Sequence, residues 1–127
     1  MFLEVIDARA FDQFVALWGE DAGEIIEEIV TLFLRSAPRM MEEMEQALEQ
    51  GNLKELRRLA HSLKANSATV GAHRMANLCQ RLEDAAEVGQ VEEAAQLLAQ
   101  VREEFPLVEG ALENVLFTFG RLPSPSE

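Results

Sequence analysis

The feature that most constrains the fold is a long run of helical periodicity between residues 21 and 51. Its apolar residues recur at intervals of three or four, the spacing that places side chains on one face of an α-helix: Ile26, Val30, Phe33, Ala37, Met41, Met44 and Leu48. Pro38 lies inside this run, and a proline there removes one backbone hydrogen bond and clashes with the preceding turn. Because the apolar spacing stays in phase across Pro38, we expect one kinked helix that starts at Glu20 or Asp21 and ends at Gly51.

Glycine and proline residues divide the rest of the chain into further helical segments. Asp7 is the expected N-cap of the first segment, Asn52 caps another, and Pro106 is expected to bend the last one. The segments expected from these signals cover residues 7–19, 53–70, 72–89 and 90–119. The connections between them are short, which favours antiparallel neighbours in an up-down bundle.

The composition agrees with an all-α fold of one domain. The chain has 127 residues, 48% of them hydrophobic, with no Tyr and a single Trp. Leu, Ala, Glu and Gln, which are good helix formers, dominate the sequence. We therefore expect an up-down four-helix bundle over residues 1–119, with an additional short N-terminal helix lying across it. Residues 120–127, with two prolines and two serines, are expected to form a flexible tail.

The charge balance limits the classes of partner. Eleven basic residues stand against 23 acidic ones, a net charge of −12, and no basic run appears. Phosphate backbones and anionic membranes attract clusters of Lys and Arg, so nucleic acid and membrane surfaces are not expected partners. No apolar run is long enough to span a bilayer, and the start of the chain lacks the features of a signal peptide. The lone Cys79 suits a reducing cytoplasm, and we expect a cytoplasmic monomer.

His61 is the residue that raises a question of function. At about 100° per residue, Leu59, Leu63 and Val70 lie within about 20° of the side opposite His61, with Leu56 near them. His61 therefore faces away from the core stripe of its own helix. The residues within about 60° of it are cationic or small: Lys54, Arg57, Lys64, Ala65 and Ala68. The alanines leave the imidazole accessible, and the cations suit an incoming negative charge.

Three interpretations of His61 remain open from the residues alone. It is a solvated surface histidine, a metal ligand or a nucleophile. The sequence has only two histidines and no Glu-x-x-His pair, so the case for a metal site is weak. The sequence motifs that bind nucleotides or flavins are absent. A neutral imidazole is a competent nucleophile near pH 7 and can carry a group covalently. An accessible imidazole beside Lys64 and Arg57 suits a phosphoryl group.

The stretch AHSLKANSATVGAHRMANLCQRLE resembles the signature of histidine-containing phosphotransfer (HPt) domains of bacterial multistep phosphorelays. The pattern is a histidine, Leu-Lys, small residues, a hydrophobic residue and Gly-Ala, represented here by His61, Leu63, Lys64, Ala65 to Ala68, Val70, Gly71 and Ala72. The likeness covers residues 7–119. Many members have glycine where Ala65 stands, and a small residue is commoner where Asn66 stands.

The resemblance implies a four-helix bundle whose histidine takes a phosphoryl group from an aspartate of one receiver domain and passes it to another. His61 would accept the group on Nε2, with Lys64 near the phosphoryl oxygens. Glu83 would accept a hydrogen bond from Nδ1–H, and Gln80 would join that network. The surface that docks the partner would include Arg57, Ala65 and Ala68.

The partners that the resemblance implies are receiver domains of a hybrid histidine kinase or a response regulator. The chain would hold no metal or cofactor, because the Mg²⁺ would belong to the receiver domain. It would be a carrier of phosphohistidine and not an autonomous kinase. The alternatives are a non-phosphorylated helical adaptor that binds signalling partners, and a bundle that binds a metal or cofactor.

Overall fold

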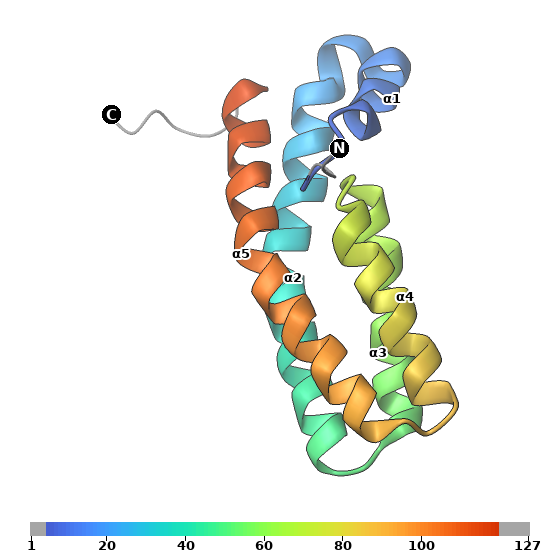
Figure 1. Cartoon of the computed structure of the whole chain (residues 1–127). Helices are drawn as coiled ribbons and strands as arrows, with labels where there is room; N and C mark the ends of the chain where they lie inside the picture. The colour runs from blue at the N-terminus through green and yellow to red at the C-terminus, as the bar shows by residue number, and fades with distance from the viewer. Residues whose placement is uncertain (1–4, 120–127) are drawn as a thin grey trace.

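A computed structural model describes residues 5–119, and the regular structure within this range is helical. Its elements, in chain order, are α1 (Arg9–Trp18), the short 3-10 turn η1 (Gly19–Asp21), α2 (Ala22–Glu49), α3 (Leu53–Thr69), α4 (His73–Glu87) and α5 (Val91–Thr118). Helices α2 to α5 form the expected up-down four-helix bundle (Figure 1). The expected C-terminal tail, residues 120–127, lies outside the described residues. Between residues 5 and 119, no helix combines the length and apolarity that a membrane span requires.

Unequal helix lengths shape the bundle. Helices α2 and α5 have 28 residues each, whereas α3 has 17 and α4 has 15. At about 1.5 Å per residue, the longer pair therefore extends well past one end of the shorter pair. At this end α1 packs against α2, beside the part of the long helices that α3 and α4 leave uncovered (Figure 1).

Helix α2 continues through Pro38 as a single helix, as the apolar periodicity predicted. The residues that it buries repeat every three or four positions along its length: Ala22, Ile26, Val30, Phe33, Ala37, Met41, Met44 and Ala47. Ala47 thus takes the last core position that was expected for Leu48, which is half-buried. Pro38 is exposed and so lies away from the core. Helix α5 continues in the same way through Pro106 and changes direction near its middle (Figure 1).

The helix ends differ from the expected ends by a few residues. Helix α1 begins at Arg9, with Ala8 in the N-cap position, so Asp7 lies one residue earlier than a cap. The Asp7 carboxylate still accepts a hydrogen bond from the backbone N–H of Arg9 at 3.0 Å. Asn52 caps α3 as predicted, because its side chain accepts from the backbone N–H of Glu55 at 3.2 Å.

Gly71, in the turn between α3 and α4, allows the N-terminal segment to approach closely. Its φ is +78°, a conformation that L side chains rarely adopt. Its carbonyl accepts a hydrogen bond from the backbone N–H of Asp7 at 2.9 Å. A Cβ at this position would lie 2.7 Å from the Asp7 carbonyl oxygen and 3.0 Å from Cβ of Ala10. The glycine therefore allows Asp7 and Ala10 to pack closely against the turn that follows α3.

Candidate functional site

His61 lies on the exposed side of α3. The residues expected to form the core stripe of this helix are 2% exposed or less: Leu56, Leu59, Leu63 and Val70. The side chain of His61, in contrast, is 63% exposed. The direction predicted from the helical wheel is therefore confirmed. A partner molecule can reach the imidazole without any rearrangement of the core.

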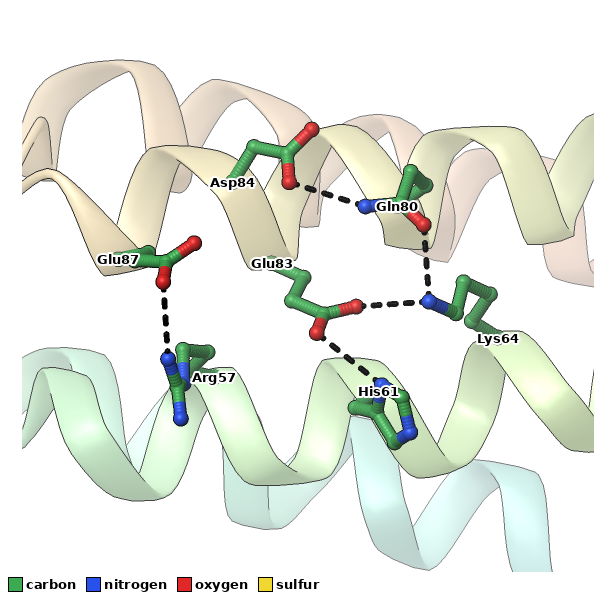
Figure 2. Close-up of polar contacts among 7 residues, drawn as sticks. All are labelled: Arg57, His61, Lys64, Gln80, Glu83, Asp84 and Glu87. Carbon is green, nitrogen blue, oxygen red and sulfur yellow. Dashed lines mark hydrogen bonds and ion pairs between the residues drawn. The ribbon is translucent and has the colours of Figure 1, made fainter.

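Glu83 of α4 joins two residues of α3 through its two carboxylate oxygens (Figure 2). Its Oε2 lies 3.0 Å from Nδ1 of His61, and its Oε1 accepts a hydrogen bond from Nζ of Lys64 at 3.0 Å. His61 and Lys64 are three residues apart, so both face the same side of α3. The Glu83 side chain is only 18% exposed, which strengthens both contacts by limiting competition from water.

Gln80 and Asp84 continue this set of contacts along α4. Nζ of Lys64 donates a second hydrogen bond, to Oε1 of Gln80 at 2.8 Å, and Nε2 of Gln80 donates to Oδ1 of Asp84 at 2.9 Å. The resulting chain of contacts, which we call the α3–α4 polar network, consists of Asp84, Gln80, Lys64, Glu83 and His61 (Figure 2). Sequence reasoning did not single out Asp84, although its spacing of four residues from Gln80 is a signal for contact on a helix.

The contact with Glu83 determines what the His61 ring can do chemically. A carboxylate accepts hydrogen bonds, so it holds the proton of a neutral imidazole on Nδ1. The other nitrogen, Nε2, then carries a free lone pair. Figure 2 shows Nε2 on the side of the ring away from Glu83. The arrangement therefore presents an exposed nucleophilic nitrogen of fixed tautomer.

The charge of Glu83 is maintained by its two neighbours. Burial by itself would raise the pKa of this carboxyl group. The hydrogen bonds from Lys64 and His61, together with the Lys64 charge, outweigh burial and lower the pKa below its usual value. Glu83 is therefore ionised at neutral pH and available as an acceptor for the ring.

The residues expected at the docking surface surround His61 on α3. Ala65 and Ala68 are both exposed. Arg57 is also exposed, and its Nη1 forms an ion pair with Oε1 of Glu87 at 3.1 Å, across from α3 to α4. An open groove of about 590 Å³ lies between the cap of α3 and His61, lined by the N-terminal half of α3 and by Glu83 and Glu87 of α4.

Residues 28–115, more than half of the chain, match the model of the Hpt domain. The chain belongs to the Hpt domain family. The match begins within α2 and ends within α5, so it includes the whole of α3 and α4. These are the two helices that contribute all the residues of the α3–α4 polar network.

Solved structures of other proteins share the fold of this Hpt domain. Histidine-containing phosphotransfer protein B from Pseudomonas aeruginosa PAO1 superposes with a TM-score of 0.78 over 92% of this chain and 98% of its own, at 23% identity. MtHPt2 from Medicago truncatula superposes with a TM-score of 0.75 over 91% of this chain and 78% of its own, at 28% identity. At 23% identity, the comparison with the Pseudomonas aeruginosa protein shows only that the fold is shared.

Several proteins with similar sequences are named as phosphotransfer or phosphorelay proteins. The Hpt domain is 31% identical over 117 residues to histidine-containing phosphotransfer protein 1 of Arabidopsis thaliana, covering 91% of this chain and 76% of the relative. It is 32% identical over 81 residues to multistep phosphorelay regulator 1 of Schizosaccharomyces pombe, covering 64% of this chain but 28% of the relative. It is also 31% identical over 106 residues to pseudo histidine-containing phosphotransfer protein 1 of rice, with coverage of 82% and 57%. The chain therefore spans less than two thirds of the second and third of these relatives.

Proposed function

We propose that this Hpt domain is a phosphorelay intermediate that carries a phosphoryl group on His61. The observation that carries the proposal is the exposed imidazole whose Nδ1 lies 3.0 Å from the Glu83 carboxylate, which leaves Nε2 free. Membership of the Hpt domain family supports the same function. The donor and the acceptor of the group would be aspartates of two receiver domains.

In the transfer step, the lone pair of Nε2 attacks the phosphorus atom of an aspartyl phosphate on the first receiver domain. The bond between phosphorus and the aspartyl oxygen breaks, and the aspartate leaves as a carboxylate. The ring keeps its proton on Nδ1, where Glu83 accepts it in a hydrogen bond and stabilises the positive charge that develops on the imidazole. Attack by the aspartate of a second receiver domain on the same phosphorus atom reverses these changes.

Lys64 has a further part in the proposal. An ammonium group has three N–H donors, and two of them are used by Gln80 and Glu83. The third would be available to a phosphoryl oxygen on His61. The Mg²⁺ required for the chemistry would belong to the receiver domain, so the chain itself would need no metal.

The remaining properties that we propose follow from this function. The chain turns over no substrate by itself, so it is a carrier and not an autonomous kinase. Its partners would be receiver domains of a hybrid histidine kinase or a response regulator. The protein would be a monomer and would act in the cytoplasm. Ala65 and Ala68 would leave the surface around the ring low enough for a receiver domain to dock.

The test is incubation of the purified protein with phosphorylated receiver domains, followed by measurement of acid-labile phosphate. Wild type and His73→Gln should both take up label, whereas His61→Gln should fold normally and take up none. Label that persists in His61→Gln would show that the assignment of His61 is wrong. A wild-type protein that binds the receiver domain but stays unlabelled would instead support the non-phosphorylated adaptor.

A further inference from the structure

The α3–α4 polar network extends three residues beyond Glu83, the residue whose side chain contacts the imidazole. Glu83 contacts His61, Lys64 contacts Glu83, and Gln80 contacts Lys64. At the far end, Asp84 accepts a hydrogen bond from Gln80 at 2.9 Å. We propose that Asp84 is a positioning residue for phosphoryl transfer, which acts on His61 through Gln80, Lys64 and Glu83. This inference rests on the proposed function, because it concerns the same histidine.

The first step of the argument is the orientation of the Gln80 amide. The amide has an acceptor on one side and donors on the other, so it can serve Lys64 and Asp84 together in one orientation only. In that orientation Oε1 faces the ammonium group and Nε2 faces the carboxylate, as the distances of 2.8 and 2.9 Å show. The reverse orientation would place NH₂ against the ammonium group and the carbonyl against the carboxylate. Asp84 therefore holds Oε1 of Gln80 toward Lys64.

The second step is the direction of the Lys64 ammonium group. A lysine side chain has many rotamers, and ordering it costs conformational entropy. Two acceptors on α4, Gln80 and Glu83, oppose this cost and fix two of its three N–H directions. Its side chain is 26% exposed, so water competes only in part for the same donors. Loss of the Gln80 acceptor would release one of these constraints.

The third step connects Lys64 to the ring. The ammonium group holds Oε1 of Glu83, and this leaves Oε2 directed at Nδ1 of His61. A carboxylate held at one oxygen keeps the other in place, so the ring keeps its tautomer and its orientation. Residues that hydrogen-bond to the direct partner of a histidine commonly affect the orientation and basicity of its ring, even though they do not touch the reacting atoms. Asp84 is exposed and makes its contact from the same face of α4 as Gln80.

The test compares two substitutions that remove the same charge. Asp84→Leu removes the acceptor for Gln80, and leucine is a good helix former, so the fold should be kept. Asp84→Asn keeps an acceptor oxygen at nearly the same place. With the small phosphodonor phosphoramidate, which needs no docking surface, we expect Asp84→Leu to slow phosphorylation about two- to tenfold, the effect of one hydrogen bond. We expect Asp84→Asn to stay within about twofold of wild type. Equal slowing by both substitutions would overturn the proposal, because it would show an effect of charge alone.

A double-mutant cycle tests the path of the effect. In a Gln80→Leu background the amide is absent, so Asp84→Leu should have no further effect on the phosphorylation rate. An effect of the same size in both backgrounds would show that Asp84 acts on His61 by another route, and this would overturn the role assigned to Gln80. The amount of folded protein in each variant is checked by circular dichroism before the rates are compared.

A second measurement does not depend on phosphorylation. The ¹⁵N shifts of Nδ1 and Nε2 in His61 report the tautomer of the neutral ring in the unphosphorylated protein. Asp84→Leu should move these shifts toward a mixture of tautomers, and Asp84→Asn should leave them close to those of wild type. Unchanged shifts in Asp84→Leu would overturn the positioning role. Absence of phosphate uptake by wild type would instead contradict the proposed function, so the two failures are distinguishable.

Discussion

Two α3 side chains depend on one carboxylate, and this makes Glu83 the residue whose ionisation matters most for the site. Its pKa is lowered because the hydrogen bonds and charges of Lys64 and His61 outweigh burial. A carboxyl group whose pKa is lower in the folded state stabilises the fold above its unfolded pKa. This contribution is lost as the pH falls through the folded pKa.

We therefore predict that Glu83→Gln removes a part of the acid sensitivity of the protein. The free energy of unfolding of wild type should exceed that of the variant by a constant amount at neutral pH. The difference should shrink as the pH falls below 4.5, the ordinary pKa of a glutamate, because the unfolded state and then the folded state bind the proton. Chemical denaturation at a series of pH values measures it. A difference that is the same at low and at neutral pH would contradict the stabilising role of the ionised carboxylate.

Ala65 gives a second prediction at the scale of the residue. It is exposed on α3, one turn after His61 and about 40° from it around the helix. Ala65→Leu should fold and melt like wild type, because leucine is a good helix former, but it would raise the surface beside the ring. A misplacement of about 1 Å can cost roughly a hundredfold in rate, so transfer from a receiver domain should fall strongly.

The matched control for this substitution is Ala95→Leu, at an exposed position of α5 outside the site. It should leave transfer from the receiver domain unchanged. Phosphoramidate should phosphorylate Ala65→Leu at nearly the normal rate, since it needs no docking surface. Unimpaired transfer from the receiver domain to Ala65→Leu would place Ala65 outside the interface, and equal loss with both donors would indicate damage at His61 itself.

At the scale of the element, the site depends on how α3 and α4 are held together. The two helices are joined by a short turn at Gly71, and the N-terminal segment packs onto this turn. Gly71 and Gly89 end α3 and α4 with nearly the same backbone conformation, at φ values of +78° and +80°. They differ in their surroundings, because nothing lies within 4 Å of a Cβ at Gly89.

Substitutions at these two glycines distinguish the cost of backbone strain from the cost of a steric clash with the N-terminal segment. Gly89→Ala should cost about 1–2 kcal/mol, the penalty for an L residue with positive φ. Gly71→Ala should cost clearly more, about 2–4 kcal/mol, because its Cβ would also lie 2.7 Å from the Asp7 carbonyl oxygen. Chemical denaturation of the two variants measures both losses. Equal losses would mean that the N-terminal segment does not constrain the turn in solution.

At the scale of the whole molecule, the apolar stripes of the helices face one another within one chain. The core contains large buried side chains from α1 and from all four helices of the bundle, among them Phe11, Ile26, Leu63, Leu82 and Leu112. Among residues 5–119, the large apolar side chains that remain exposed are distributed over α1, α2, the turn between α4 and α5, and α5. Single exposed apolar residues of this kind are normal on a monomer. The net charge of −12 also opposes association between copies.

We therefore predict that the protein is a monomer in solution. Sedimentation velocity at micromolar concentration and moderate salt should show one species near 14.2 kDa. The same value should persist at higher salt, which screens the repulsion between acidic surfaces. A species of twice this mass at either salt concentration would contradict the prediction.

The sequence by itself determined the helices and the direction of His61. Both depend on spacing along one helix, and a period of 3.6 residues is visible in a single stretch of sequence. The continuity of α2 through Pro38 was predictable for the same reason. The helix ends were less certain, since α1 starts at Arg9 and η1 precedes α2. Such boundaries depend on capping contacts and vary by one or two residues.

The tertiary structure alone decided which side chains meet across helices. Glu83 reaches both His61 and Lys64, and Arg57 reaches Glu87, although these partners are between 19 and 30 residues apart in the chain. The family resemblance implied the contact between Glu83 and His61, but no local sequence pattern predicted it. The close approach of the N-terminal segment to Gly71 could not be predicted from the sequence either. The physical reason is that the register between two helices is set by how their buried side chains pack, and periodicity within one helix carries no information about its neighbour.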